Sequence, residues 1–231
     1  ICQDINVDLG EAAEIRSQWA REAGPVYYDG KPHKILLHTN QSPGDAVAIT
    51  GAIYSLHKMY PGRFLTAIQT PWQEVFDYNP HIDLLSDAES LQVHYPAIHE
   101  SNSRGIHFMQ GICEHIGAAL GVIVPLLTNR PHLYFDYPAS SVEDFWLICS
   151  GGKKDFTNKL WGHHNYQALV DILAGDVNFV QVGGIHDDHE PLFGVECMLG
   201  RTSLRDLFDL TRRARGVVCG VSLMMHVAAA L

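Results

Sequence analysis

The most informative pattern in the chain is a short apolar run followed by a polar turn and by apolar residues at helical spacing. Residues 35–37 are Ile-Leu-Leu, the turn is Asn40-Gln-Ser-Pro-Gly44, and apolar residues recur from Ile49 to Met59 at intervals of three and four. The pattern predicts a buried strand, a tight turn and a helix beginning near Asp45. In open α/β sheets, ligands bind at such helix starts. The spacing is equally compatible with an Asp45 that only caps its helix.

The same alternation of strand and helix patterns continues along the chain. We expect further strands at residues 64–69, 82–85, 145–149, 178–182 and 217–219. Helices are expected at 11–23, 72–76, 106–120, 166–173, from 204 onward and at 222–231. The polar, His-rich residues 86–104 are interpreted as a long surface segment. Strands that alternate with helices favour parallel sheets.

A stretch with few helix signals divides this pattern into two halves. Residues 129–141 include Pro131 and Pro138 and are interpreted as a link between two lobes. The prediction is an N-terminal lobe at residues 1–135 and a C-terminal lobe at 142–231. Both would be α/β, with a cleft between them.

Composition narrows the class of protein. The chain has 231 residues, of which 46% are hydrophobic, and this is enough for a sizeable core. Its net charge of -10 disfavours a general role on nucleic acid or anionic membranes. The five cysteines are scattered without a CxxC pair, which indicates a reducing compartment, and no signal peptide or 18-residue apolar span is visible. We expect both ends to continue in a longer protein, because the chain starts without Met and stops inside an apolar run.

Two polar loops in the second half could do chemistry. Residues 150–159 combine glycines, which let an anion approach the backbone, with lysines that would neutralise it, although from this loop alone a solvated turn with exposed lysines is favoured. His186-Asp-Asp-His-Glu190 contains five potential metal ligands, but five successive residues cannot all converge on one ion. A loop that contacts the hydroxyls of a ligand is therefore favoured. A metal-dependent hydrolase that uses His186, Asp188 and His189 is kept as an alternative.

The last predicted helix starts at a second candidate anion site. Ser222 would cap this helix and present its N–H groups to a phosphate. His226 lies one turn further on, where a packed histidine is the more common finding. The motifs GxSxG and HExxH and the kinase-type set are absent, and the absence of GxGxxG disfavours a dehydrogenase.

Taken in order, four segments of the chain resemble the ADP-heptose:lipopolysaccharide heptosyltransferases, which are inverting glycosyltransferases of family 9. Ser42-Pro-Gly-Asp45 is similar to the S-x-G-D turn of the family, and Gly152 to Trp161 to its lysine–tryptophan stretch. Gly200-Arg-Thr-Ser-Leu204 is similar to G-x-T-S-L, and Ser222 to Leu231 to D-T-G-x-x-H-L-A-A-A-L. The long first-lobe segment and Leu-Met-Met also resemble a subgroup that glycosylates bacterial autotransporter proteins.

The resemblance implies a fold, a reaction and a set of residue roles. The fold would be GT-B, with two Rossmann-like lobes, mostly parallel sheets and an incomplete C-terminal lobe. A heptose would pass from a nucleotide-diphosphate donor, ADP-heptose, to a hydroxyl of a glycan or a protein. Asp45 would be the general base, and the other implied contacts with substrate are Ser42, Gly44, Lys159, Gly184, Asp187, Thr202, Ser222 and His226. No metal or other cofactor is implied; the protein would be cytoplasmic or at the inner-membrane surface and could form oligomers.

Two departures from the family pattern keep another hypothesis open. The acidic residue that the family has five positions before the histidine is Val221 here, and its glycine is Leu223. These changes affect the turn that is expected to meet the diphosphate. A non-catalytic relative that binds nucleotide-sugars is therefore the main alternative.

Overall fold

The computed structural model describes residues 30–231, except residues 86, 93–103, 139–140 and 154–158. The chain divides into two compact units, one ending at Phe135 and the other spanning Asp136–Leu231. The helix predicted at residues 11–23 lies outside the described residues. Each unit contains one parallel sheet, so the predicted alternation of parallel strands and helices is confirmed in both halves.

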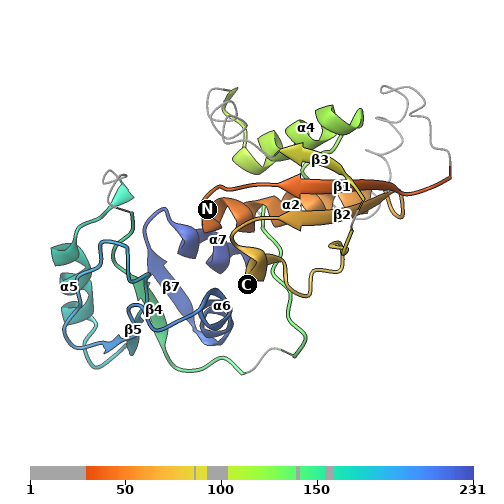
Figure 1. Cartoon of the computed structure of the whole chain (residues 1–231). Coiled ribbons are helices and arrows are strands. Elements are labelled where there is room, and N and C mark those ends of the chain that lie inside the picture. The colour runs from red at the N-terminus through yellow and green to blue at the C-terminus, as the bar shows by residue number, and fades with distance from the viewer. Residues whose placement is uncertain (1–29, 86, 93–103, 139–140, 154–158) are drawn as a thin grey trace. The chain divides into compact units, whose positions relative to one another are not determined.

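The sheet of the first unit has three strands in the order β2-β1-β3 (Figure 1). They are β1 (His33–His38), β2 (Phe64–Gln69) and β3 (Glu89–Gln92). In the central strand, Leu36 is paired with Ala67 on one side and with Ser90 on the other. Ile35 and Leu37 are fully buried and Leu36 is partly buried, which explains why β1 is read so clearly as an apolar run.

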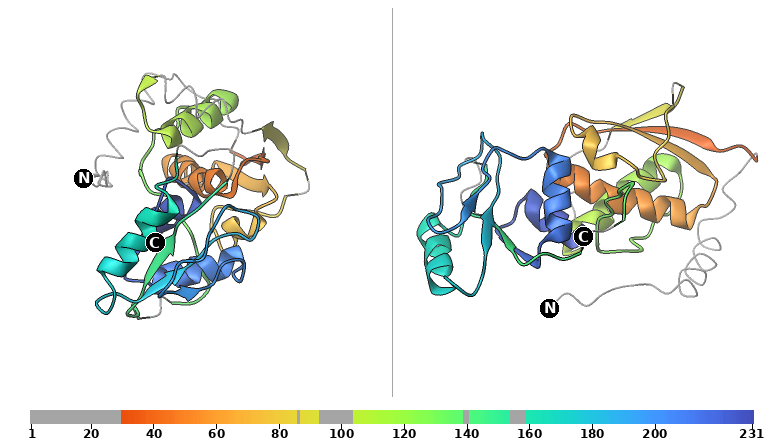
Figure 2. Two further views of the ribbon diagram at one scale, coloured as in Figure 1. Left: turned by 90° about the vertical axis from the view of Figure 1, so that its left-hand side faces the viewer. Right: turned by 90° about the horizontal axis from the view of Figure 1, so that it is seen from below.

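Helix α2 (Pro43–Met59) connects β1 to β2 and buries twelve of its seventeen residues. Helix α4 (Phe108–Leu120) packs beside it (Figure 2). A Cβ at position 51 would overlap the Met109 methyl group, so Gly51 is what allows the two helices to approach closely. The 3₁₀ helix η1 (Gln73–Phe76) follows β2.

The predicted strand at residues 82–85 is wrong, and the third strand lies instead inside the segment interpreted as surface. Residues 82–85 form no ladder, and Leu84 is fully exposed. Asp83 donates one backbone hydrogen bond to Thr66 at 2.7 Å and makes no further pairing there. Strand β3 has the sequence Glu-Ser-Leu-Gln, which carries too little apolar pattern to be recognised.

The sheet of the second unit has four parallel strands in the order β6-β5-β4-β7. They are β4 (Trp146–Cys149), β5 (Phe179–Gln181), β6 (Glu196–Cys197) and β7 (Gly216–Cys219). The sequence predicted β4, β5 and β7. It missed β6 because a two-residue strand has no periodicity to detect.

Helices cover both faces of this second sheet. Leu147 and Val180 pack on one face with α6 (Leu204–Arg213) and α7 (Leu223–Ala230). Ile148 packs on the other face with α5 (His163–Ile172). Successive residues of β4 thus point to opposite cores, as the two-residue period of a strand requires. Among the described residues, no helix is both long and apolar enough to cross a membrane.

Candidate functional site

Each sheet reverses its strand order at one point, and several of the residues predicted to contact substrate lie next to these points. In the first unit, β2 lies on one side of β1 and β3 on the other. In the second unit, β5 and β6 lie on one side of β4 and β7 on the other. Ligands of open α/β sheets bind outside the carboxyl ends of the strands at such switch points. Ser42 and Asp45 follow β1, Lys159 follows β4, and Ser222 follows β7. Gly184 and Asp187 follow β5 instead, and Thr202 follows β6.

Hydrogen bonds hold the turn after β1 in place. Thr39 is fully buried, and its N–H donates to the carbonyl of Gln69 at 3.0 Å. The indole N–H of Trp72 donates to the carbonyl of Gln41 at 2.6 Å. The ends of β1 and β2 are thereby tied together immediately before α2 begins.

Asp45 caps its own helix. Its carboxylate accepts the N–H of Ser42 at 3.2 Å, in the arrangement of a capping box, while Gly44 is buried between them. Asp45 is only partly buried. A carboxylate has two oxygens with about four acceptor positions, so capping is compatible with accepting a further proton. Catalysis by Asp45 stays a prediction.

The turns after β4 and β5 close around the ring of His189. A Cβ on Gly183 would overlap this ring, and a Cβ on Gly151 would lie 2.7 Å from its Nδ1 atom. The side chain of His189 is 3% exposed, and its Nε2 atom lies 3.9 Å from Oδ2 of Asp187. Burial lowers the pKa of His189, and the carboxylates of Asp187 and Asp188 offset only part of this effect. The ring is therefore neutral at pH 7.

A fully buried amide fixes the segment that follows. Gln181 donates to the Ser150 hydroxyl at 2.9 Å and to the Glu190 carbonyl at 2.8 Å. Its oxygen accepts the N–H of Leu192 at 2.9 Å. The N–H of Asp188 also donates to the carbonyl of Gly152 at 2.8 Å. These bonds hold residues 186–192 across the ends of β4 and β5.

The residues predicted to lie near a nucleoside share one corner of this sheet. Asp187 donates its N–H to the carbonyl of Gly184 at 3.2 Å. The N–H of Gly200 donates to the carbonyl of Gly183 at 2.9 Å. Thr202 is partly buried directly before Ser203, which caps α6. The loops after β5 and β6 therefore lie against each other, and the implied nucleoside contacts stay predictions.

The backbone of Lys159 lies against the turn that follows β7. A Cβ on Gly220 would lie 2.8 Å from the carbonyl oxygen of Lys159, so glycine is needed for this approach. Lys159 is exposed, and Ser222 is the N-cap residue of α7. His226 is partly buried one turn into the same helix. The structure thus brings Lys159 and Ser222 to the same switch point.

Three further features characterise this edge of the sheet. Val221, which stands where the family has an acidic residue, is 54% exposed. Ser222 lies beside the Cys149 thiol, whose pKa burial raises to about 12. Trp161 is half exposed and packs edge-on against Tyr166 at 5.1 Å between ring centroids. Apolar surface therefore borders the glycine turns.

Residues 186–190, which contain five potential metal ligands, show no metal centre. In the part of the chain that the structure describes, no three His, Cys, Asp or Glu side chains are grouped to hold an ion. The alternative ligand set splits, since His189 is enclosed between glycine turns while His186 is exposed. The sequence reasoning missed Gln181, although a glutamine inside the apolar run Phe-Val-Gln-Val was a visible signal.

Comparison with solved structures defines the fold as the GT-B type of glycosyltransferases. The *E. coli* ADP-heptose LPS heptosyltransferase II superposes with a TM-score of 0.57 at 16% identity, covering 85% of this chain and 82% of that one. *E. coli* heptosyltransferase WaaC with ADP-2-deoxy-2-fluoro heptose gives 0.60 at 13% identity, with 85% of each chain covered. The predicted fold class is confirmed, while the predicted cleft and lobe boundaries stay predictions.

Within that class, part of the chain matches a family model. Residues 132–231 match the model of glycosyltransferase family 9 (heptosyltransferase), which confirms the resemblance seen in the sequence. The iron-containing dodecameric glycosyltransferase TibC from enterotoxigenic *E. coli* H10407 superposes with a TM-score of 0.62 at 15% identity. The comparison covers 87% of this chain but only 56% of TibC, so the chain spans little over half of that protein. Among curated proteins, no sequence is significantly similar to the chain.

Proposed function

We propose that the protein is an inverting glycosyltransferase that moves a heptose from ADP-heptose to a hydroxyl group. One observation carries the proposal: Lys159, Ser222 and the loop of Gly184 and Asp187 come from distant parts of the sequence to one edge of the second sheet. The family model that residues 132–231 match and the ADP-heptose in the description of one TibC structure support the donor.

The proposed reaction is a single displacement at the anomeric carbon of the donor sugar. The acceptor oxygen forms the new glycosidic bond, its proton passes to the carboxylate of Asp45, and the bond to the diphosphate breaks with its electron pair. Positive charge develops on the sugar ring and negative charge on the leaving ADP. Lys159 and the backbone N–H groups near Ser222 would stabilise the leaving group, and Asp45 would activate the acceptor. These residues can act without a metal or another cofactor.

The acceptor remains one of two classes. Similarity to a lipopolysaccharide heptosyltransferase favours a glycan hydroxyl, whereas the resemblance to the autotransporter subgroup favours a protein hydroxyl. TibC is described as dodecameric, which supports assembly of several copies of this protein. We place the reaction in the cytoplasm or at the inner-membrane surface, where acceptors of both classes are accessible.

The exposed Val221 favours a second candidate, a relative that binds nucleotide-sugars without transferring them. An aliphatic side chain at this turn cannot accept hydrogen bonds from the donor. Mass spectrometry of products, after incubation with ADP-heptose, other nucleotide-sugars and a panel of glycan and protein acceptors, separates the candidates. Donor binding without any transferred sugar would favour the second one.

The test of the catalytic assignment is the pair Asp45→Ala and Asp45→Asn. Asn keeps an oxygen for the Ser42 N–H but is a poor base, so it separates capping from proton transfer. We expect both variants to bind donor and to lose transfer by about 100-fold or more. Asp87→Asn, at an exposed carboxylate paired with Lys34, is the matched control and should retain activity. Near-normal turnover in Asp45→Asn would remove Asp45 as the base.

A further inference from the structure

The ring of His189 occupies a slot made by two glycines from different strand ends. Gly151 follows β4 and Gly183 follows β5, and a Cβ at either position would collide with the segment that carries His189. Both positions that border the imidazole of His189 are thus glycines, which have no side chain. An apolar side chain of similar size would fill the same slot, so packing alone does not require histidine there.

The polar atoms of the ring make contacts that packing does not explain. The Nδ1 atom is buried and finds no hydrogen-bond partner among the described residues. A neutral imidazole carries one proton, and the Nε2 atom faces Oδ2 of Asp187 at 3.9 Å. This distance is about 0.7 Å beyond the usual limit of a hydrogen bond, so a small shift of Asp187 would close it.

Asp187 lies over the adjacent glycine of the same loop. A Cβ on Gly184 would lie 2.8 Å from Oδ2 of Asp187, the same oxygen that faces His189. The carboxylate is therefore folded back over its own turn toward the buried ring, although the residue itself is exposed to solvent. The orientation of the Asp187 carboxylate therefore depends on the side chain at position 189, which lies beneath it.

We propose that His189 is a positioning residue of the donor site. Its side chain holds the 184–188 loop in place over the carboxyl ends of β4 and β5, and it directs the carboxylate of Asp187 toward the donor. This inference rests on the proposed function, because it assigns Asp187 to the hydroxyls of a nucleotide-sugar. The ring has two tasks. Its bulk anchors the loop, and its Nε2–H orients Asp187.

Two substitutions separate these tasks. His189→Ala removes both, whereas His189→Phe fills the slot and offers no N–H. We expect His189→Ala to speed hydrogen exchange of the loop amides, including the Asp188 N–H bonded to Gly152, and to raise the donor KM about tenfold. His189→Phe should restore slow exchange but keep the raised KM. Turnover at saturating donor should change by less than about threefold in either variant. His164→Ala, at an exposed histidine of α5 outside this loop, is the control and should change neither quantity.

A double-mutant cycle completes the test. If His189 acts through Asp187, Asp187→Ala alone should raise the donor KM, and adding His189→Phe should raise it no further. Additive effects, or a normal KM in His189→Phe, would overturn the orienting role. Unchanged loop exchange in His189→Ala would overturn the anchoring role. Failure of the wild type to bind ADP would refute the proposed function instead, and the exchange measurement would still test the anchor.

Discussion

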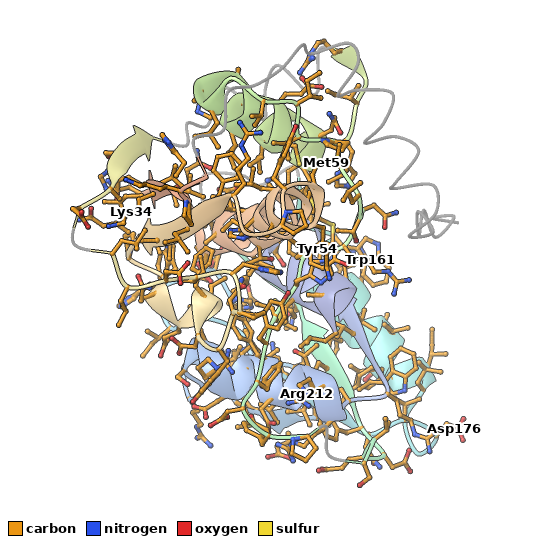
Figure 3. The ribbon with its side chains drawn as sticks, turned by 90° about the vertical axis from the view of Figure 1, so that its right-hand side faces the viewer. Lys34, Tyr54, Met59, Trp161, Asp176 and Arg212 are labelled. Carbon is orange, nitrogen blue, oxygen red and sulfur yellow. The ribbon has the colours of Figure 1, made fainter. Side chains whose placement is uncertain are left out.

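A row of stacked rings in the first unit predicts that this unit loses stability in mild acid. Tyr54 projects from α2 (Figure 3) and stacks on His132, with ring centroids 4.0 Å apart. His57 stacks on His81 at 4.8 Å and bonds to the hydroxyl of Thr66 at 2.9 Å. Burial is the main cause that lowers the pKa of both His57 and His132 to about 4. The nearby His81, whose own pKa is also lowered, adds to this effect.

The sign and size of the effect follow from proton uptake. The unfolded chain protonates a histidine below about pH 6.5, whereas the folded unit resists protonation until about pH 4. Stability is therefore complete above pH 6.5 and decreases as the pH falls toward 4. The full shift would correspond to about 3 kcal/mol for each histidine. His57 and His132 are only partly buried, so solvent screening reduces the expected loss to about 1–2 kcal/mol each.

The variant His132→Phe isolates the contribution of His132 to this loss of stability. Phenylalanine keeps a ring against Tyr54 and removes the group that takes up the proton. Urea unfolding at pH 7.5 and pH 4.5, followed by hydrogen exchange of α2 peptides, gives the free energy of unfolding of this unit. The wild type should lose about 1 kcal/mol more than His132→Phe between these pH values. His33→Phe, at an exposed histidine of the same unit, controls for the substitution itself. Equal losses in the wild type and His132→Phe would refute the reasoning.

Two further predictions concern the buried segment of the second unit. Gln181→Ala leaves its three hydrogen-bond partners without their bonds and should lower the free energy of unfolding by about 2–4 kcal/mol, as measured in urea. A loss below about 0.5 kcal/mol would show that water replaces the amide at no cost. Gly151→Ala places a Cβ into the Asp188 carbonyl and should cost about 2 kcal/mol or more. Gly152→Ala, whose Cβ would meet nothing closer than 3.9 Å, should be far better tolerated; equal costs for the two alanines would contradict the account.

Local pattern was sufficient for most of the elements. The strands β1, β2, β4, β5 and β7 and the helices α2, α4, α5, α6 and α7 were predictable, because these strands are apolar runs and a helix repeats every 3.6 residues. It was insufficient for β3 and β6, which are short and carry few apolar residues. Their place is set by pairing with β1 and β5, and pairing partners do not appear in a local window.

The sequence by itself also determined which segments are predicted to contact substrate. The motifs from Ser42 to His226 resemble those of a known family and occur in the same order. Only the tertiary structure decided that His189 fills a slot between Gly151 and Gly183 and that Gln181 holds the segment around it. The reason is that the contacts of Gly151 with His189 and of Gln181 with Ser150 join residues more than 30 positions apart. Whether a glycine, a histidine or a glutamine serves a turn, a ligand or a core depends on which distant backbone lies against it, and folding alone brings that backbone there.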